Sequence, residues 1–446
     1  MGFATDIMLD EEILIRDALH EEARPQPGRG PSAQRRRVVV TGVGLCSSLG
    51  WDEEGVRGSL AAGRTTFRES VHMPGVPVCP ITDLGDDAPF AWLSSWRHRR
   101  YLSRAAFLSL LAGLRAAADA GFAGSMPPDT DLIGTAAPNL DFERERDLPP
   151  GDGEGLDALW LLRWLPNTGN TALARCLGIH GEGLTLGCAC ASSLQALGEG
   201  AARVASGRAR RVLVACGDSR LSRGGLLGYA KARVLSANDN PPRASRPFDN
   251  ARDGFVPGEG GAAFVLEERS AALARGARVR GEILGHGASL DGGSLTAPEA
   301  SGIYAEEAVR RALDMAGVDA PDWVAAHGTG TVLSDAMEAA MLGRVLGGAR
   351  PPVTALKSWI GHAASACGAL ETAILLMAAR DGILPGVRNL ESPLPAPIRL
   401  ARARAVGGRV VSDSPALVDG SVGLVENFGF GGQNAALVLR VGDSAI

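Results

Sequence analysis

One cysteine stands where a nucleophile could act: Cys190, in the run Gly-Cys-Ala-Cys-Ala-Ser-Ser that begins at Gly187. Small residues end a strand-like run at this point and a helix begins, which places Cys190 at a helix N-terminus. Unpaired backbone N–H groups and the positive end of the helix dipole favour a thiolate there and could also hold an oxyanion. A cysteine among alanines can instead be a small buried hydrophobic residue. A metal or redox pair with Cys188 is not favoured, because one residue separates the two and no second Cys/His pair follows.

Two histidines follow predicted buried strands at 323–326 and 353–356. His327 opens the run His-Gly-Thr-Gly-Thr, and His362 ends the run Lys-Ser-Trp-Ile-Gly-His. Open α/β sheets keep their binding sites at the carboxyl ends of strands, so both histidines are candidates for chemistry. The alternative is that each is a loop histidine whose ring satisfies only local hydrogen bonds.

Three charged residues accompany the histidines. Asp335 and Glu338 are three residues apart at the start of a predicted helix, where they share one face and suit the positive end of the helix dipole. Capping of that helix is the simpler explanation for them. Lys357 lies in an otherwise apolar stretch, and a lysine is rarely buried without an acidic partner. We therefore expect Lys357 to pair with Glu338 or Asp335.

Glycines and aromatic residues combine in one loop near the C-terminus. The run Asn-Phe-Gly-Phe-Gly-Gly-Gln-Asn occupies 427–434, between two hydrophobic runs. A glycine-rich hairpin turn would account for it. A phosphate cradle is not favoured, because the loop lacks both a Lys-Ser/Thr ending and a following helix. Phe428 and Phe430 among the glycines indicate backbone that approaches a ligand closely, with an aromatic gate.

Predicted strands and helices alternate along the chain and would position these residues. The strands are at 38–44, 211–216, 261–266, 323–326 and 353–356, and the helices at 104–120, 191–206, 303–316, 335–346 and 362–380. The pattern begins again near 275–285 and closes with a hairpin at 421–440. This alternation predicts an α/β architecture with mostly parallel sheets covered by helices. We expect an N-terminal extension at 1–36, a half at 37–276 that carries the cysteine, and a half at 277–446 that carries both histidines.

Composition narrows the class of protein. The 446 residues carry 45 Lys+Arg and 50 Asp+Glu, a net charge of −5, which offers no overall attraction for nucleic acid or an anionic membrane. No apolar run reaches the roughly 18 residues that a membrane span needs. The seven cysteines are scattered and odd in number, which does not suit a disulfide framework. We expect a globular protein of the reducing cytoplasm.

Taken together, the four segments resemble the β-ketoacyl synthase (ketosynthase) family, the condensing enzymes of fatty acid and polyketide synthesis, over roughly residues 37–441. The family's nucleophile motif matches 189–193, its two histidine motifs match 327–338 and 357–362, its closing loop matches 428–434, and a further segment matches 246–260. The resemblance implies a thiolase-like fold: two similarly built halves, each with a five-stranded sheet, stacked as α-β-α-β-α layers and usually dimeric.

The resemblance also implies a decarboxylative condensation of an acyl thioester with a malonyl unit. Cys190 would carry the acyl group, and its backbone N–H and that of Phe430 would hold the thioester oxyanion. His327 and His362 would donate hydrogen bonds to the enolate formed by loss of CO2. Lys357 would orient the histidines and pair with Glu338.

Substrate contacts and partners follow from the same resemblance. Thr329 and Thr331 would hold a phosphopantetheine arm, and Phe428 and Phe430 would bound the acyl pocket, with Phe430 as a gate. The expected partner is an acyl carrier protein. No metal or soluble cofactor is expected, and a homodimer or a heterodimer with a ketosynthase-like subunit would form the assembly.

Two other functions are compatible with the same motifs. A non-decarboxylative, thiolase-type acyltransferase would use the same Cys190, although the paired histidines and the Lys-Ser-x-x-Gly-His run argue against it. A non-enzymatic chain-length subunit typically lacks the nucleophile, whereas Cys190, His327 and His362 are all present here. The sequence leaves the length and unsaturation of the acyl group, the pathway and the carrier protein open.

Overall fold

The computed structural model describes residues 36–85, 88–122, 124–135, 140, 159–418 and 420–442. These residues belong to one compact unit, Arg36–Ile446. The predicted N-terminal extension lies, except for Arg36, outside the described residues. None of the helices within these ranges is long and apolar enough to cross a lipid bilayer.

The first half of the chain builds a five-stranded portion of the sheet, in the order β5-β4-β6-β7-β1. Its strands are β1 (Val38–Cys46), β4 (Asp131–Thr135), β5 (Gly183–Leu186), β6 (Arg211–Ser219) and β7 (Glu259–Glu268). Its larger helices are α3 (Arg104–Asp119), α4 (Thr168–Leu177) and α5 (Ser192–Ser206). The expected strands at 38–44, 211–216 and 261–266 and helices at 104–120 and 191–206 are all present, with ends shifted by a few residues.

The second half repeats this arrangement with one further edge strand, β11, so that it has six strands where five were expected, in the order β11-β10-β9-β14-β15-β8. Its strands are β8 (Gly281–Leu290), β9 (Trp323–Ala325), β10 (Pro352–Thr354), β11 (Arg399–Leu400), β14 (Val422–Gly429) and β15 (Gln433–Val441). Its larger helices are α9 (Ile303–Ala316), α10 (Val332–Leu346) and α12 (Cys367–Ala379). The helix expected at 362–380 therefore begins five residues late, and His362 lies in the loop before it.

Shorter elements connect these. They are α2 (Glu53–Ala62), β2 (Arg68–Glu69), β3 (Pro77–Val78), α6 (Arg223–Lys231), α7 (Pro241–Ala244), α8 (Arg269–Ala274), α11 (Lys357–Ile360), β12 (Ala403–Val406) and β13 (Arg409–Ser412). Single turns of 3₁₀ helix are η1 (Ala88–Ser94), η2 (Arg97–Tyr101), η3 (Trp160–Arg163), η4 (Ala189–Ala191) and η5 (Ala364–Ala366).

The two halves join through a short antiparallel pairing of β1 with β8, where Val38 faces Ile283. The result is one continuous sheet of eleven strands in the described part of the chain. The expectation of mostly parallel pairing is wrong for its middle, because β6-β7, β7-β1, β1-β8, β8-β15 and β15-β14 are all antiparallel. Parallel pairing is confined to the two outer flanks.

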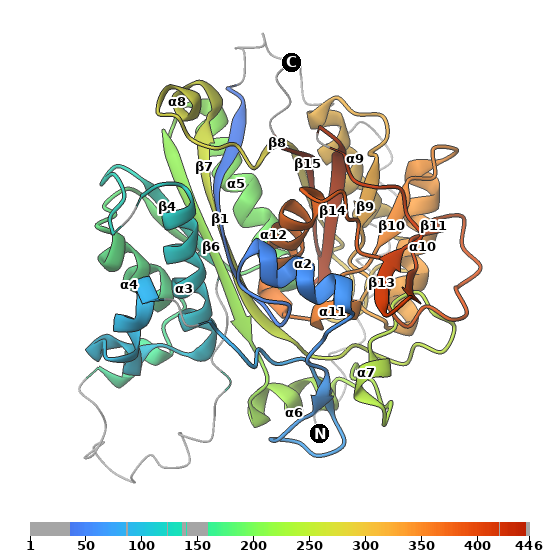
Figure 1. Cartoon of the computed structure of the whole chain (residues 1–446). Helices are drawn as coiled ribbons and strands as arrows, with labels where there is room; N and C mark the ends of the chain where they lie inside the picture. Colours follow the sequence, from blue (N-terminus) through green and yellow to red (C-terminus); the bar gives the residue numbers. More distant parts are fainter. Residues whose placement is uncertain are drawn as a thin grey trace, which may run out of the picture. The chain divides into compact units, whose positions relative to one another are not determined.

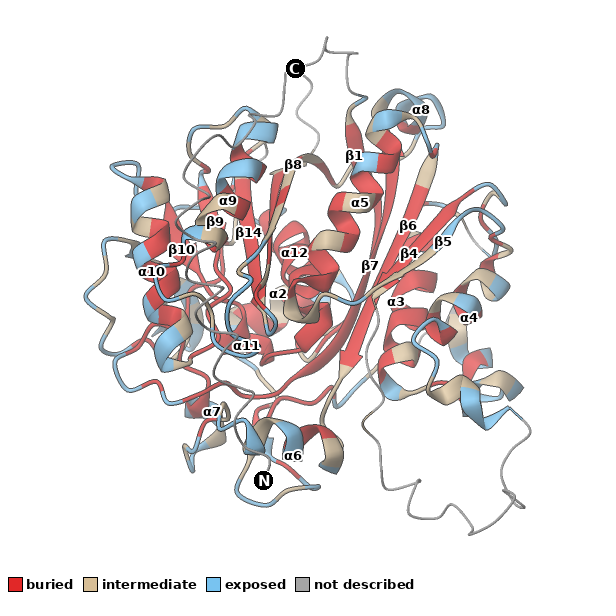
Figure 2. Ribbon diagram, turned by 180° about the vertical axis from the view of Figure 1, so that it is seen from behind, coloured by how far each residue is buried: buried red, intermediate tan, exposed pale blue. Residues whose placement is uncertain are grey.

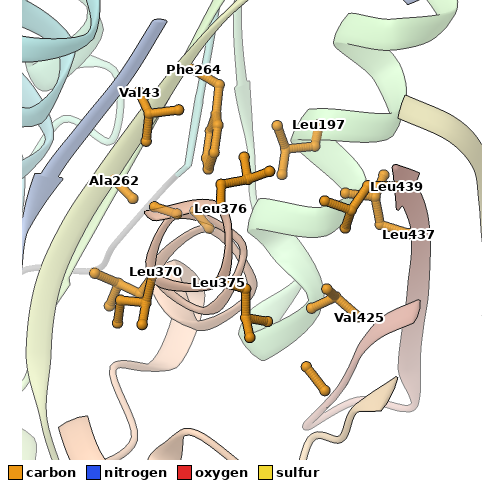
Figure 3. Close-up of a cluster of buried hydrophobic side chains, with 14 of the residues drawn as sticks. Val43, Leu197, Ala262, Phe264, Leu370, Leu375, Leu376, Val425, Leu437 and Leu439 are labelled. Carbon is orange, nitrogen blue, oxygen red and sulfur yellow. The ribbon is translucent and has the colours of Figure 1, made fainter. Parts of the chain in front are cut away.

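Helices fill three layers around this sheet. α5 and α12 lie between the two halves and share one hydrophobic cluster with the inner faces of both (Figures 1 and 3), which includes Phe264, Leu370 and Leu437. α3 and α4 cover the outer face of the first half, and α9 and α10 that of the second. All thirteen residues of α12 are buried (Figure 2), as expected for a helix that is apolar on every side. This is the α-β-α-β-α arrangement of the thiolase-like fold.

The same kind of close contact occurs in both halves. At Gly44 in β1, an added Cβ would overlap the carbonyl oxygen of Ala112 in α3, and at Gly287 in β8 it would overlap that of Ala308 in α9. Each outer helix therefore approaches its strand at a distance that only glycine permits. The matching contacts are physical evidence that the two halves are built alike.

We expect Gly44→Ala to destabilise the protein by about 1–3 kcal/mol, because the added methyl group must push α3 away from β1. The measurement is the urea unfolding midpoint followed by circular dichroism. Gly183→Ala is the matched control, since a Cβ at this strand glycine has no neighbour within 4 Å. Equal stability of the two variants would contradict the contact.

Candidate active site

Cys190 sits in a tight turn between β5 and α5. The turn is η4, in which Ala189 adopts a left-handed backbone conformation with φ of 46°. The Ser192 hydroxyl holds the turn by accepting the Cys188 N–H at 2.8 Å and donating to the Ala189 carbonyl at 2.6 Å. A strained alanine that surrounding bonds keep in place is typical of a residue that presents a reactive neighbour.

Two groups from the second half of the chain lie beside the Cys190 sulfur. His362 Nε2 lies 3.4 Å from Sγ, and the backbone N–H of Phe430 donates to the same sulfur. The hairpin that carries Phe430 comes this close because Gly429 has no side chain: a Cβ there would lie 2.8 Å from the Cys190 nitrogen. Gly429 therefore lets the backbone of this loop approach the nucleophile. The expected approach of the loop to a ligand stays a prediction.

Burial raises the pKa of Cys190 to about 11. The cations of Arg220 and Lys357 and the Phe430 N–H act in the opposite direction but do not outweigh the loss of water. Burial therefore opposes the thiolate that a helix N-terminus favours at Cys190. The expected thiolate stays a prediction that the pH dependence of alkylation can test.

His362 is held as a neutral ring with its proton on Nε2. The Ala364 N–H donates to Nδ1 at 2.9 Å, so Nδ1 is an acceptor, and Cys367 Sγ lies 3.3 Å from the same nitrogen. Burial, together with the positive charges of Lys357 and Arg220, lowers the pKa of His362 well below its usual range. The Nε2–H group consequently points at the Cys190 sulfur.

His327 lies against Asn427. The Asn427 side-chain nitrogen is 3.3 Å from His327 Nδ1, and the same nitrogen donates to Glu371 Oε2 at 2.9 Å and to the Glu426 carbonyl at 2.5 Å. Burial and the charge of Lys357 lower the pKa of His327 well below the usual range. The ring stands nearly perpendicular to that of His362, with centroids 5.6 Å apart, and packs on Phe428 at 5.7 Å.

Glu338 and Asp335 hold the loop that follows His327 by accepting its backbone hydrogen bonds. Glu338 accepts the backbone N–H groups of His327 at 2.5 Å and Gly328 at 2.8 Å. Asp335 accepts those of Gly330 at 3.0 Å and Phe248 at 2.7 Å. The two acids do share one face of α10, as expected, but that face binds the preceding loop. Burial raises the pKa of Asp335 to about 6 and that of Glu338 to about 7.

The expected pairing of Lys357 with Glu338 or Asp335 is wrong. Its Nζ lies 2.6 Å from Glu371 in α12, and both side chains are fully buried. Burial alone would lower the pKa of Lys357, but the Glu371 charge outweighs it and keeps the amine protonated. Glu371 Oε2 also accepts from Asn427 at 2.9 Å, which links the ion pair to His327. The sequence contained one signal for Glu371, an acidic residue inside an apolar helix.

A further carboxyl group was missed. Glu426 in β14 is fully buried, and its two oxygens accept no hydrogen bond from the described residues. Burial and the neighbouring Glu338 raise the pKa of Glu426 well above its usual range. Glu426 and Glu338 therefore interact electrostatically, and burial together with this neighbour favours the protonated form of Glu426.

The remaining predicted residues occupy the rim of this centre. Thr329 is buried and its hydroxyl lies 3.0 Å from that of Thr331, which is half-buried. Phe428 is buried against His327, whereas Phe430 is 39% exposed. The structure thus brings together the cysteine, both histidines, Lys357 and both phenylalanines.

We expect Glu371→Gln to lower the free energy of unfolding by about 3–5 kcal/mol, because it leaves the Lys357 charge buried without its partner. Thermal unfolding measures the change. Asp381→Asn is the control, since it breaks the half-exposed ion pair with Arg57 and should cost no more than about 1 kcal/mol. Similar losses of unfolding free energy in both variants would contradict the larger contribution that we expect from the buried Lys357–Glu371 pair.

Two family models match the chain. The model described as Beta-ketoacyl synthase, N-terminal domain, matches residues 35–272, and that described as Beta-ketoacyl synthase, C-terminal domain, matches 280–391. The first contains the cysteine turn, and the second contains both histidines and Lys357.

Known relatives cover almost the whole chain. It is 32% identical over 436 residues to 3-oxoacyl-[acyl-carrier-protein] synthase 2 of Rhizobium meliloti, which covers 91% of this chain and 99% of that protein. It is also 32% identical over 440 residues to Actinorhodin polyketide putative beta-ketoacyl synthase 1 of Streptomyces coelicolor, with 92% and 90% covered. The solved structure of the ishigamide ketosynthase/chain length factor superposes with a TM-score of 0.78 at 30% identity, covering 92% of this chain and 100% of that one. Since motifs, fold and family models agree along both halves, the chain belongs to the β-ketoacyl synthase family.

Proposed function

We propose that this β-ketoacyl synthase holds an acyl group on Cys190 and condenses it with a malonyl unit that loses CO2. The observation that carries the proposal is the arrangement around one sulfur. Cys190 lies against the Phe430 backbone N–H and the His362 Nε2–H, and the His327 ring lies beside that of His362. A nucleophile and several N–H donors in a dry site suit a reaction that passes through oxyanions.

The first step transfers the acyl group from a thioester to the enzyme. The Cys190 sulfur attacks the carbonyl carbon, the C–S bond to the carrier breaks, and the thiol proton passes to the departing sulfur. Because burial raises the pKa of Cys190, its proton must be removed before or while the new bond forms. The backbone N–H groups of Cys190 and Phe430 are the donors that we assign to the carbonyl oxygen as it becomes negative.

The second step forms the carbon–carbon bond. The C–C bond to the malonyl carboxylate breaks, its electron pair remains on the thioester as an enolate, and CO2 departs. The enolate carbon then attacks the acyl carbon on Cys190, and the released sulfur takes a proton from solvent. We assign His327 and His362 as donors to the enolate oxygen. For His362 the assignment is supported by the Ala364 N–H, which donates to Nδ1 and so leaves the ring proton on Nε2.

Other residues support these steps in the proposal. The buried Lys357 orients the histidines through Glu371 and Asn427 and keeps both rings neutral by its charge. Thr329 and Thr331 line the entry of a phosphopantetheine arm, and Phe430 is the gate of the acyl pocket. No metal or soluble cofactor enters this reaction.

The proposed partner is an acyl carrier protein that delivers both substrates. Support comes from the relative in Rhizobium meliloti, whose name specifies a substrate carried by such a protein. A ketosynthase and a chain length factor share the ishigamide structure, which supports a heterodimer for this chain as well, and a homodimer is the alternative. All seven cysteines are free, in keeping with the proposed location in the cytoplasm.

Cys190→Ala should abolish both the covalent acyl adduct and product formation. The assay is intact-mass spectrometry after incubation with acyl-loaded carrier protein, followed by malonyl carrier protein with detection of CO2. Cys188→Ala is the matched control and should keep the adduct. Condensation by Cys190→Ala would overturn the proposal, and a product formed from acetyl units without CO2 would establish the thiolase-type reaction instead.

The pH dependence of alkylation tests the resting thiol. With its pKa raised to about 11, Cys190 should react with iodoacetamide at a rate that rises by about tenfold per unit between about pH 7 and pH 10. Peptide mapping follows Cys190 separately from the other cysteines. A plateau below the ordinary thiol pKa of about 8.5 would show a resting thiolate and contradict the effect of burial.

A further inference from the structure

The first residue of each central helix occupies the same place in its half of the fold. The run Ala-Cys-Ala-Ser occupies 189–192, and the run Ala-Ser-Ala-Cys occupies 364–367. In each run the first alanine is left-handed and the last residue begins the helix, α5 or α12. Ser192 and Cys367 are therefore structural counterparts. Cys367 is buried, and the steps proposed above give it no part.

The two counterparts accept the same backbone hydrogen bond. The Ser192 hydroxyl accepts the N–H of Cys188, four residues earlier in the chain. The Cys367 sulfur accepts the N–H of Ala363, which is also four residues earlier. Each side chain thereby fastens the turn that precedes its helix, and the turn holds the Cys367 sulfur in a defined place.

The protons of the two side chains go to different acceptors. Ser192 donates to the Ala189 carbonyl at 2.6 Å, within its own turn. The Cys367 sulfur instead lies 3.3 Å from Nδ1 of His362. Because the Ala364 N–H donates to that nitrogen at 2.9 Å, Nδ1 carries no proton, and the thiol is the donor in this contact. Burial raises the pKa of Cys367 well above its usual range, which favours the protonated thiol.

This contact joins the His362 ring to the central helix. Phe255 packs on the ring with centroids 4.8 Å apart, and the Cys190 sulfur lies 3.4 Å from Nε2. At Nδ1, Ala364 belongs to the same loop as His362, whereas Cys367 is part of α12. Since all residues of α12 are buried, Cys367 fixes the ring to a rigid part of the fold.

We propose that Cys367 is a positioning residue for His362: its thiol donates to Nδ1, holds the ring against α12 and keeps the ring proton on Nε2, beside Cys190. The proposal rests on the proposed function, in which the Nε2–H of His362 donates to the enolate oxygen. Cys367 acts through His362 rather than on the substrate.

Three substitutions separate the hydrogen bond from the packing of the side chain. Cys367→Ala removes the donor, and Cys367→Ser supplies a hydroxyl that can donate the same bond. Cys46→Ala is the matched control, because it deletes an equally buried thiol in β1, which contacts Arg115 in α3. The full chain is acylated with hexanoyl-pantetheine and checked by intact mass. The rate of CO2 release is then measured at increasing concentrations of malonyl-pantetheine.

We expect Cys367→Ala to lower the maximal rate of CO2 release by about two- to fivefold, the effect of one weak hydrogen bond, with the half-saturating concentration nearly unchanged. Cys367→Ser should restore the rate to within about twofold of the unmodified protein, and Cys46→Ala should keep it. An unchanged rate in Cys367→Ala, equal losses in both Cys367 variants, or the same loss in Cys46→Ala would overturn the proposal.

The nitrogen NMR spectrum of protein labelled with isotopic histidine tests the hydrogen bond itself. The Nδ1 resonance of His362, identified by its loss in His362→Gln, should move in Cys367→Ala and return toward its original position in Cys367→Ser. An unmoved resonance in Cys367→Ala would overturn the hydrogen bond whatever the rates. If the acylated, unmodified protein released no CO2, the proposed function would fall and the kinetic role of Cys367 with it, while this resonance would still decide the contact.

Discussion

The ion pair between Lys357 and Glu371 is the interaction on which the rest of the site depends. A charged amine in the dry interior is stable only beside a carboxylate, and this pair brings the loop after β10 against the central helix α12. His362 follows Lys357 by five residues, and Asn427 connects Glu371 to His327. Burial, together with the positive charge of Lys357, keeps both imidazoles neutral. One buried pair therefore positions two rings and adds to the effect of burial on their protonation.

Loss of solvation on burial also shifts the protonation of Cys190 and Glu426. Burial raises the pKa of Cys190 despite the nearby cations, which favours the thiol. Burial also raises the pKa of Glu426 beside Glu338, which favours its protonated form. Because His362 uses Nδ1 as an acceptor, it presents an Nε2–H donor rather than a base, and burial keeps the His327 ring neutral. The site is thus rich in donors and poor in bases, which favours chemistry that creates negative charge on oxygen and generates its carbanion by losing CO2 instead of by removing a proton.

Features of the site that depend on neighbouring residues can be predicted from the sequence, whereas features that depend on long-range packing cannot. Strand, glycine turn and helix signals located the segments that carry Cys190, His327 and His362, because each is encoded within about ten residues. The partner of Lys357 was misplaced, since the choice between Glu338 and Glu371 depends on how α10 and α12 pack. The direction of strand pairing in the middle of the sheet is likewise invisible to hydrophobic periodicity. The effect of burial on the pKa of Cys190 cannot be read from the sequence for a related reason. A helix terminus is a local feature, whereas burial belongs to the assembled fold.

The two halves contain the same kind of backbone turn, which serves a different purpose in each. Each has a 3₁₀ turn before its central helix, η4 before α5 and η5 before α12, and each turn contains a left-handed alanine, Ala189 with φ of 46° and Ala364 with φ of 41°. In the first half the turn presents the nucleophile, and in the second its N–H sets the tautomer of His362. The turns contact each other across the middle of the molecule. The duplicated fold thereby brings the Cys190 sulfur of the first half against the His362 ring of the second. Neither half forms the site alone.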